Sequence, residues 1–290
     1  MGLYPQPNDW TCGPFALKHG LISLGRLVSG DKLTRLAGSR WWSGTDEIGL
    51  AAAARANECD LGMVRKRSPE KARKELISLL REGVPVVLCV DDWAHWITVV
   101  GVERSNFVVV DSNMEPVLNV LTWAQLRKRW QYLDRDYDAE EPPAIYDMCP
   151  VVPRFRVTIK ANFSVERVRY LRRFENRHLA HSWDVYLEDL LAICRPPSHR
   201  LTQPLSMAEF LRRNQAMIVS HVVYWHGDVE RKDIMRLLGN FRFVAETYGL
   251  VIPESNSRRA TVDIAILATM WAVAWRGIGD MYGSAGEGRG

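Results

Sequence analysis

Three closely spaced apolar runs limit the folds open to this chain. Residues 84–90, 95–102 and 107–111 are rich in Val and Ile, and short segments of turn residues such as 103–106 separate them. Runs of this length and composition predict β-strands. Strands joined by such short turns pair antiparallel, because a parallel pair needs a crossover of a dozen or more residues. The sequence therefore predicts an antiparallel meander.

Helical patterns surround the predicted strands. Pro14 suits the first turn of a helix, where its missing N–H costs nothing, and Gly83 follows a strongly amphipathic segment, as expected just past a helix end. Four helices are predicted before the strands and one after them: residues 13–25, 31–38, 46–56, 69–82 and 122–130. Helices first and strands after indicate an α+β domain, in which helices pack on an antiparallel sheet.

The chain changes character after an acidic, proline-rich segment at residues 134–153, which we interpret as a linker. A strand is possible at 154–160, and a Ser206–Glu209 capping box is expected to open one of the later helices. Four helices are predicted beyond the linker: residues 164–193, 207–225, 229–248 and 261–276. The sequence thus predicts two domains, residues 1–150 and an all-helical domain at 151–290 that ends in a flexible, glycine-rich tail at 283–290.

Composition favours a globular protein without a membrane segment. The apolar fraction is 47% and the charged fraction 25%, and no uncharged apolar stretch reaches the length of a bilayer span of about 18 residues. The N-terminus does not have the pattern of a secretory signal, so we expect a cytoplasmic protein. The net charge of +4 comes from the C-terminal half, where basic residues lie on predicted helix faces. That placement favours solvated helices or a protein partner over nucleic acid.

Five scattered cysteines without a CxxC pair argue against a disulfide framework and against a structural zinc site. Two histidine pairs at helical spacing, His178 with His181 and His221 with His226, are the alternative metal candidates. They lack an intervening glutamate motif, and such histidines are commonly structural. We therefore predict no metal and no cofactor. Cys89 lies inside an apolar run, where a buried thiol is the simplest interpretation.

Cys12 occupies a different environment. A nucleophilic cysteine must be a thiolate, yet an ordinary thiol has a pKa of about 8.5. A helix N-terminus and a neighbouring imidazole both favour the charged form. Cys12 comes directly before the first predicted helix, and Gly13 allows close approach of the backbone. His95 begins a predicted strand and would supply the imidazole.

The predicted hairpin brings a third group to His95. Asp111 ends the next strand, and pairing about a turn near residue 104 places it beside His95, where a carboxylate would orient the ring. Gln6 lies six residues before Cys12, and its side-chain amide could join the Cys12 backbone N–H in stabilising an oxyanion. Trp93 and Trp96 flank His95, and one of them could wall a substrate cleft. Each residue alone has a structural interpretation, but the combination is far less frequent by chance.

These residues resemble a known family. Gln6, the run Cys12-Gly13-Pro14, His95 with its apolar strand, and Asp111-Ser112 are similar to the bacteriocin-processing, double-glycine type of papain-like cysteine peptidase. Segments 43–45 and 83–87 also look like that family, and the resemblance covers residues 3–130. It implies a papain-like N-terminal domain, a triad of Cys12, His95 and Asp111, and Gln6 in the oxyanion hole. No membrane-export or ATPase module accompanies the domain, so a transporter-coupled role is not expected.

The sequence therefore predicts a cysteine hydrolase that cleaves a peptide or amide bond through a thioester acyl-enzyme. Its substrate would be a peptide or protein, and the C-terminal helical domain could bind a protein partner. Two alternatives stay open. The first is a cysteine-dependent transferase or glutamine deamidase on the same fold, since fold alone does not fix the reaction. The second is a non-catalytic peptide-binding module.

Overall fold

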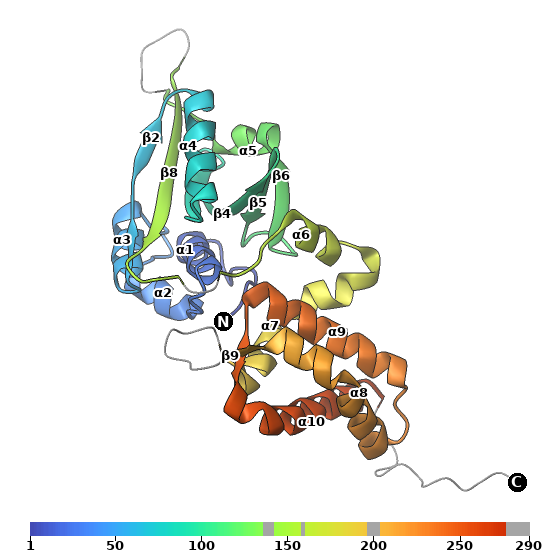
Figure 1. Cartoon of the computed structure of the whole chain (residues 1–290). Helices are drawn as coiled ribbons and strands as arrows, with labels where there is room; N and C mark the ends of the chain where they lie inside the picture. Colours follow the sequence, from blue (N-terminus) through green and yellow to red (C-terminus); the bar gives the residue numbers. More distant parts are fainter. Residues whose placement is uncertain (136–141, 158–159, 196–203, 277–290) are drawn as a thin grey trace, which may run out of the picture. The chain divides into compact units, whose positions relative to one another are not determined.

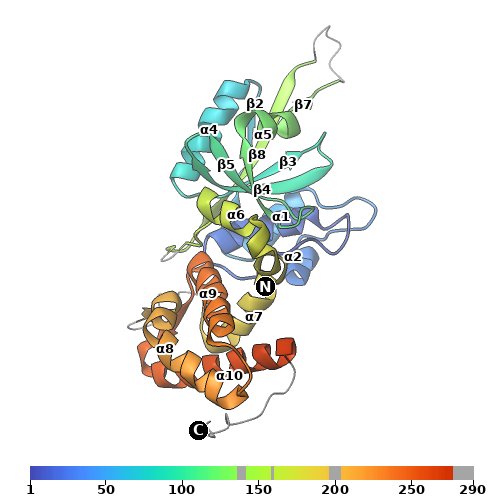
Figure 2. The same cartoon turned by 90° about the vertical axis from the view of Figure 1, so that its right-hand side faces the viewer.

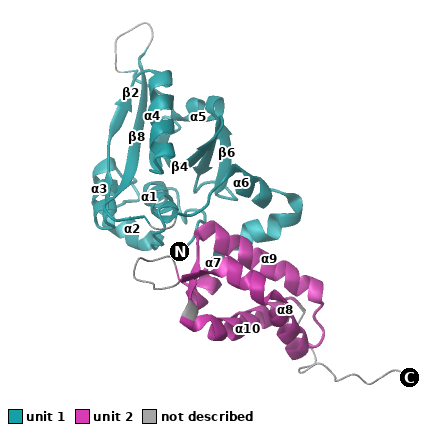
Figure 3. Ribbon diagram, viewed as in Figure 1, with its two compact units in different colours: residues 1–184 teal, residues 185–290 magenta. Residues whose placement is uncertain are grey.

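The computed structural model describes residues 1–135, 142–157, 160–195 and 204–276, and the chain forms two compact units, Met1–Asp184 and Val185–Gly290 (Figure 3). Parts of the predicted linker and of the possible strand at 154–160, together with the predicted flexible tail, lie outside the described residues. The N-terminal unit is α+β with an antiparallel sheet, as the sequence predicts.

The predicted meander is confirmed. Strands β3 (Val86–Val90), β4 (His95–Glu103) and β5 (Asn106–Val110) pair antiparallel in chain order, and β6 (Leu118–Thr122) extends them by one strand. Figure 1 shows β4, β5 and β6 side by side. His95 is the first residue of β4 and pairs with Val90, the last residue of β3, so it lies at the end of the sheet.

The sheet continues on the other side of β3, where the sequence analysis predicted a linker. Strand β8 (Ala144–Pro153) pairs with β3 and also with three short strands, so the main path runs β1-β8-β3-β4-β5-β6. The short strands are β1 (Cys59–Leu61), β2 (Val64–Lys66) and β7 (Tyr132–Leu133). The linker prediction is therefore wrong for residues 144–153.

The buried acid in β8 explains that error. Asp147 gave the segment a loop-like composition, but its carboxylate accepts two hydrogen bonds from Arg65 of β2, from Nε and Nη2, both at 2.7 Å. A paired, bidentate carboxylate can occupy a sheet that an isolated charge could not. Pro150 is also tolerated, since its carbonyl accepts from Gly62 N–H at 2.9 Å.

Alternation along β3 builds a core on each face of the sheet. Val87 and Cys89 belong to one buried cluster and Leu88 and Val90 to the other, as the two-residue period of a strand requires. Figure 2 shows that the helices of the N-terminal unit lie on both sides of the sheet. The first cluster includes residues of α1 (Cys12–Ser23), α2 (Gly30–Leu36) and α3 (Glu47–Arg55), and the second includes residues of α4 (Pro69–Arg81) and α5 (Trp123–Trp130).

The predicted helix at 164–193 is broken. Helix α6 (Val165–Leu171) packs near β5 and β6, and its first backbone N–H donates to the Glu103 carboxylate at 3.0 Å. A short 3-10 turn follows at Phe174–Asn176, and α7 (Arg177–Ile193) crosses the boundary between the two units. The domain boundary expected at residue 150 falls inside β8, whereas the structure divides between Asp184 and Val185.

The second unit is built on three long helices where the sequence predicts them: α8 (Met207–His226), α9 (Arg231–Tyr248) and α10 (Ser257–Arg276). The sequence did not reveal a small two-stranded sheet of β9 (Pro204–Ser206) and β10 (Val251–Pro253). The expected capping box at the start of α8 does not form, because the Glu209 carboxylate binds Arg212 and Arg213 instead. Among the described helices, none combines the length and the apolar character needed to cross a membrane.

Candidate active site

Helix α1 begins at Cys12, one residue before its predicted start at Gly13. Gly13 allows a close approach there, because a Cβ atom at this position would lie only 3.0 Å from the Thr45 Cβ and 3.4 Å from Trp96 Cδ1. This close approach places the start of α1 against the sheet beside His95. Cys12 is 6% exposed, so the N-terminal peptide dipoles act on its sulfur with little solvent screening.

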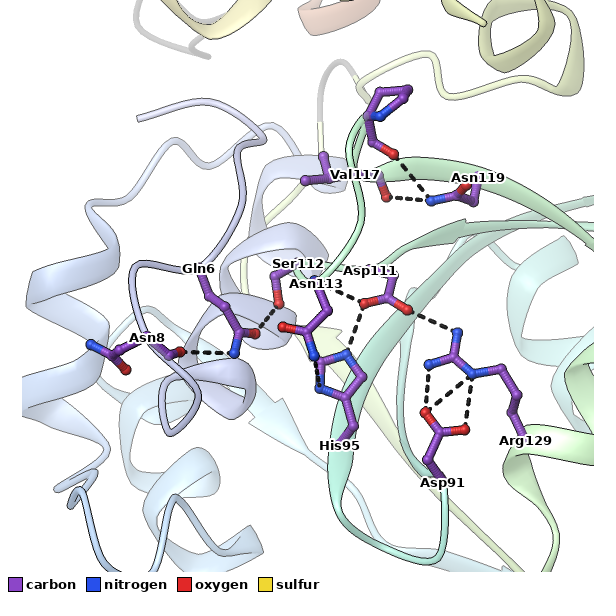
Figure 4. A network of polar contacts seen from close by, with 11 residues as sticks. Gln6, Asn8, Asp91, His95, Asp111, Ser112, Asn113, Val117, Asn119 and Arg129 are labelled. Carbon is purple, nitrogen blue, oxygen red and sulfur yellow. Dashed lines mark hydrogen bonds and ion pairs between the residues drawn. The ribbon is translucent and has the colours of Figure 1, made fainter. Parts of the chain in front are cut away.

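The hairpin of β4 and β5 brings His95 and Asp111 into contact. His95 Nε2 lies 2.8 Å from Asp111 Oδ1, and both side chains are buried (Figure 4). A bulge between Val99 and Gly101 shifts the register of the two strands on the way to this end. The predicted contact of the histidine with the carboxylate is thus confirmed, while the catalytic roles of the two residues stay a prediction.

Cys12 is also within hydrogen-bonding reach of the His95 ring. Burial alone would lower the pKa of His95, but hydrogen bonds to Asp111 and to Cys12 outweigh it and raise that pKa to about 9. Because Nε2 faces Asp111, Nδ1 is the ring nitrogen left for the sulfur. Asn113 Nδ2 also approaches Nδ1, at 3.5 Å. The imidazole therefore lies between a thiol and a carboxylate, in an environment that favours its charged form.

Two further groups hold the Asp111 carboxylate in addition to His95. Arg129 Nη1 donates to Oδ2 at 2.8 Å, and the Asn113 backbone N–H donates to Oδ1 at 3.0 Å. Burial would raise the pKa of Asp111, but these bonds and the one from His95 lower it to about 2. The sequence analysis missed Arg129, which is one of three consecutive basic residues in α5 with nothing in the pattern to distinguish it.

Gln6 joins the N-terminal segment to this end of the sheet. Its backbone N–H donates to the Ser112 carbonyl at 3.0 Å, and its side-chain oxygen accepts from Ser112 Oγ at 2.6 Å. One side-chain N–H donates to the Asn8 carbonyl at 2.8 Å. An amide nitrogen carries two hydrogens, so a second remains for a ligand. Figure 4 shows the side chain reaching toward Ser112, next to Asp111.

The two tryptophans that flank His95 have different environments. Trp96 is 7% exposed, belongs to the core cluster behind Cys12, and donates its indole N–H to the Thr45 carbonyl at 3.2 Å. Trp93 is 39% exposed and stacks on Tyr132, with ring centroids 3.8 Å apart. Trp96 therefore supports the site from the interior, and only Trp93 presents a surface to solvent.

The other four cysteines are buried thiols. Burial raises the pKa of Cys59 to about 11 and those of Cys149 and Cys194 to about 12, and it raises that of Cys89 further. Burial thus disfavours the thiolate in all four, and the thiolate is the nucleophilic form of cysteine. Within the described ranges, no cluster of three His, Cys, Asp or Glu side chains could hold a metal ion.

The shifted pKa of His95 predicts a pH-dependent stability. Because the folded-state pKa of about 9 lies above the ordinary 6.5, the stabilisation is complete below pH 6.5 and is lost as the pH rises through 9. We expect the free energy of unfolding to fall by about 3 kcal/mol over that interval. Urea unfolding at several pH values measures it. Asp111→Asn should flatten the dependence, and an equal slope in both proteins would contradict the assignment.

Comparison with solved structures returns double-glycine peptidase domains, the family that the sequence resembles. The peptidase domain of Streptococcus ComA, a bifunctional ABC transporter of a quorum-sensing pathway, is 16% identical, with 52% of this chain and 97% of that chain covered and a TM-score of 0.38. A double-glycine-motif protease from an AMS/PCAT transporter, in complex with its leader peptide, is 15% identical, with coverages of 51% and 91% and a TM-score of 0.37.

A putative C39-like peptidase from Bacillus anthracis is 12% identical, with 53% of this chain and 96% of that chain covered and a TM-score of 0.38. No protein-family model matches the chain, and no curated protein sequence matches it.

Proposed function

We propose that this protein is a cysteine hydrolase that cleaves a peptide or amide bond through Cys12, His95 and Asp111. One observation carries the proposal: the buried His95 ring lies 2.8 Å from the Asp111 carboxylate and within hydrogen-bonding reach of Cys12, the first residue of α1. A thiol, an imidazole and an orienting carboxylate in this order are the parts that nucleophilic acyl transfer requires.

The reaction follows from the positions of the protons. The Cys12 thiolate attacks the carbonyl carbon, and the C–N bond breaks as the His95 imidazolium gives its proton to the leaving amine. A thioester and a neutral imidazole remain. Water then attacks the thioester, His95 takes a proton from that water, and the C–S bond breaks to release the acid and restore the thiolate–imidazolium pair. Asp111 keeps Nε2 of His95 protonated throughout, so that Nδ1 faces the sulfur.

The oxyanion of each tetrahedral intermediate needs donors that do not move during the reaction. We assign the Cys12 backbone N–H and the second side-chain N–H of Gln6 to this role. Ser112 and Asn8 hold the Gln6 amide at both ends, which fixes the direction of its N–H groups. Trp93, exposed and stacked on Tyr132, is proposed to contact the substrate peptide.

The helical unit of residues 185–290 would select a protein substrate or partner. Its three long helices form their own core, and its described residues contain no arrangement of nucleophile, base and acid comparable to that around His95. A cysteine transferase or a glutamine deamidase would use the same acyl-enzyme and differ only in the substrate or acceptor, so the acyl-enzyme is the step to test first.

The test uses 4-nitrophenyl acetate as the acyl donor at neutral pH. We expect a stoichiometric burst of 4-nitrophenolate, with the acetyl group mapped to Cys12 by mass spectrometry, followed by slower turnover as water hydrolyses the thioester. Cys12→Ser should lose the burst. Cys89→Ala is the matched control, since Cys89 is 7% exposed and Cys12 6%, and it should keep the burst.

Labelling spread over several cysteines, or no burst in the folded wild-type protein, would favour the non-catalytic binding module. Adding a primary amine then separates a hydrolase from a transferase. A hydrolase releases acetate at an unchanged rate, whereas a transferase converts the amine to its acetamide.

A further inference from the structure

We infer that Arg129 is a positioning residue of the proposed site, which fixes the Asp111 carboxylate and the turn leading into His95 with a single guanidinium group. The inference rests on the proposed function, because it assigns Arg129 a part in holding the groups proposed to react. Arg129 itself touches neither Cys12 nor His95 in any described contact, so it acts through its two neighbours.

The guanidinium divides its donors between two carboxylates. Nη1 donates to Asp111 Oδ2 at 2.8 Å, while Nη2 and Nε donate to Asp91 Oδ2 and Oδ1 at 2.6 and 3.0 Å (Figure 4). The main chain closes the link, because the Asp91 N–H donates to the Arg129 carbonyl at 2.7 Å. Arg129 thus ties the end of α5 to the ends of β3 and β5 at once. Solvent screens the contact with Asp111 weakly, because the two side chains are 26% and 3% exposed, whereas the Asp91 carboxylate is 41% exposed.

Asp91 begins the turn that carries His95. Asp91, Asp92 and Trp93 have φ values of +57°, +56° and +63°, which are left-handed conformations that residues other than glycine seldom adopt. Such a turn persists only where the surroundings fix it. Two contacts do so: Arg129 binds Asp91, and Tyr132 stacks on Trp93. Since His95 follows two residues after Trp93, the position of its ring depends on this turn.

The charges around Asp111 agree with this role. Burial opposes ionisation of the carboxyl, and His95 and the Arg129 guanidinium overcome it and hold the pKa of Asp111 low. His19 of α1 also lies near but is kept neutral, because burial lowers its pKa well below the usual value. The charged or titratable groups that face this centre, directly or through one neighbour, are His95 of β4, Arg129 of α5, Cys12 and His19 of α1, and Asp91 after β3.

A lysine cannot replace this arginine. The planar guanidinium reaches two carboxylates with a fixed angle between its donors, whereas an ammonium group is a single point charge on a flexible stem. Arg129→Lys therefore separates the bridging geometry from the positive charge. Lys128→Gln is the matched control: the residue lies on the same helix, is exposed, and loses the same charge without touching Asp111.

The experiment measures the second-order rate of Cys12 alkylation by iodoacetamide on the full chain, from about pH 4 to pH 9. Arg129→Gln should slow alkylation at pH 6 by about 10-fold, since a less well-held Asp111 stabilises the imidazolium less. The acid limb of the profile should move to higher pH, because Asp111 then protonates at higher pH. The alkylation rate of Arg129→Lys should lie between those of the wild type and Arg129→Gln. The rate of Lys128→Gln should match that of the wild type.

A double-mutant cycle with Asp111→Asn decides whether Arg129 acts through Asp111. We expect Arg129→Gln to change the rate less than twofold in the Asp111→Asn background. The inference would be overturned if the two substitutions slowed alkylation by independent factors that multiply in the double variant. It would also be overturned if Arg129→Lys were alkylated as fast as the wild type. If Arg129→Gln does not fold, Asp91→Asn takes its place, and a wild-type rate in that variant would equally overturn it.

Failure of the proposed function gives a different result. If alkylation of wild-type Cys12 is as slow as that of an ordinary thiol and unaffected by His95→Ala, the proposed site is not active whatever Arg129 does. A fast, His95-dependent Cys12 with no response to Arg129 or Asp91 refutes the positioning role alone.

Discussion

His95→Ala is expected to slow alkylation of Cys12 at pH 6 by about 10²–10³-fold. A thiol without a partner, with a pKa of about 8.5, is only a fraction of a per cent ionised at that pH. In the wild type the imidazolium persists, because hydrogen bonds raise the pKa of His95 to about 9. In the proposed mechanism this imidazolium stabilises a thiolate in a buried setting where solvent screens little. The rate of carbamidomethylation by iodoacetamide, resolved to Cys12 by peptide mapping, measures the effect.

His181→Ala is the control for that substitution. His181 is exposed and hydrogen-bonds to Glu115, so its loss removes a histidine and a carboxylate contact without touching the His95 ring. Asp111→Asn should slow alkylation less than His95→Ala, because it weakens the hold on the ring without removing it. Equal alkylation rates in wild type and His95→Ala would refute the ion pair of Cys12 with His95.

Trp130→Ala should destabilise the N-terminal unit by about 3–5 kcal/mol, the range for removing a large buried side chain. Trp130 is 1% exposed, packs edge-on against Tyr146, and donates its indole N–H to the Asp147 carbonyl at 2.7 Å. Its loss leaves a cavity and an unpaired carbonyl in the core. We expect the melting temperature to fall by about 6–20 °C, measured by circular dichroism.

Trp41→Ala is the matched control, because the same side chain there is 74% exposed. Its melting temperature should stay within about 2 °C of the wild type, since exposed substitutions away from special features change stability little. A loss in Trp41→Ala comparable with that in Trp130→Ala would mean that the loop before α3 is packed in solution.

Local signals explain what the sequence could predict. The start of α1 at Cys12 follows from Gly13 and Pro14, and the contact of His95 with Asp111 follows from a hairpin whose turn is short enough to set the register. Both depend on residues close together in the chain. For the same reason the helices at 69–81 and 231–248 lie within one or two residues of the predicted ends.

Long-range pairing explains what the sequence could not predict. Strand β8 pairs with β3, which lies more than 50 residues earlier in the chain. Its Asp147 is tolerated in the sheet only because Arg65 binds the carboxylate. Arg129 meets Asp91 and Asp111 through tertiary contacts that no periodicity encodes. Trp96 was expected beside a cleft, but it faces the core because its place in β4 points it at α1.

The order of the strands has a consequence for synthesis on the ribosome. Every residue proposed to react lies before residue 112, yet β3, whose last residue leads into the turn before His95, has one edge open until β8 at 144–153 has emerged. An open edge strand is a pairing hazard in a partly made chain. We therefore expect the nascent protein to contain all of the residues proposed to react for some 40 residues of elongation before β8 pairs with β3 and the sheet that positions them is complete.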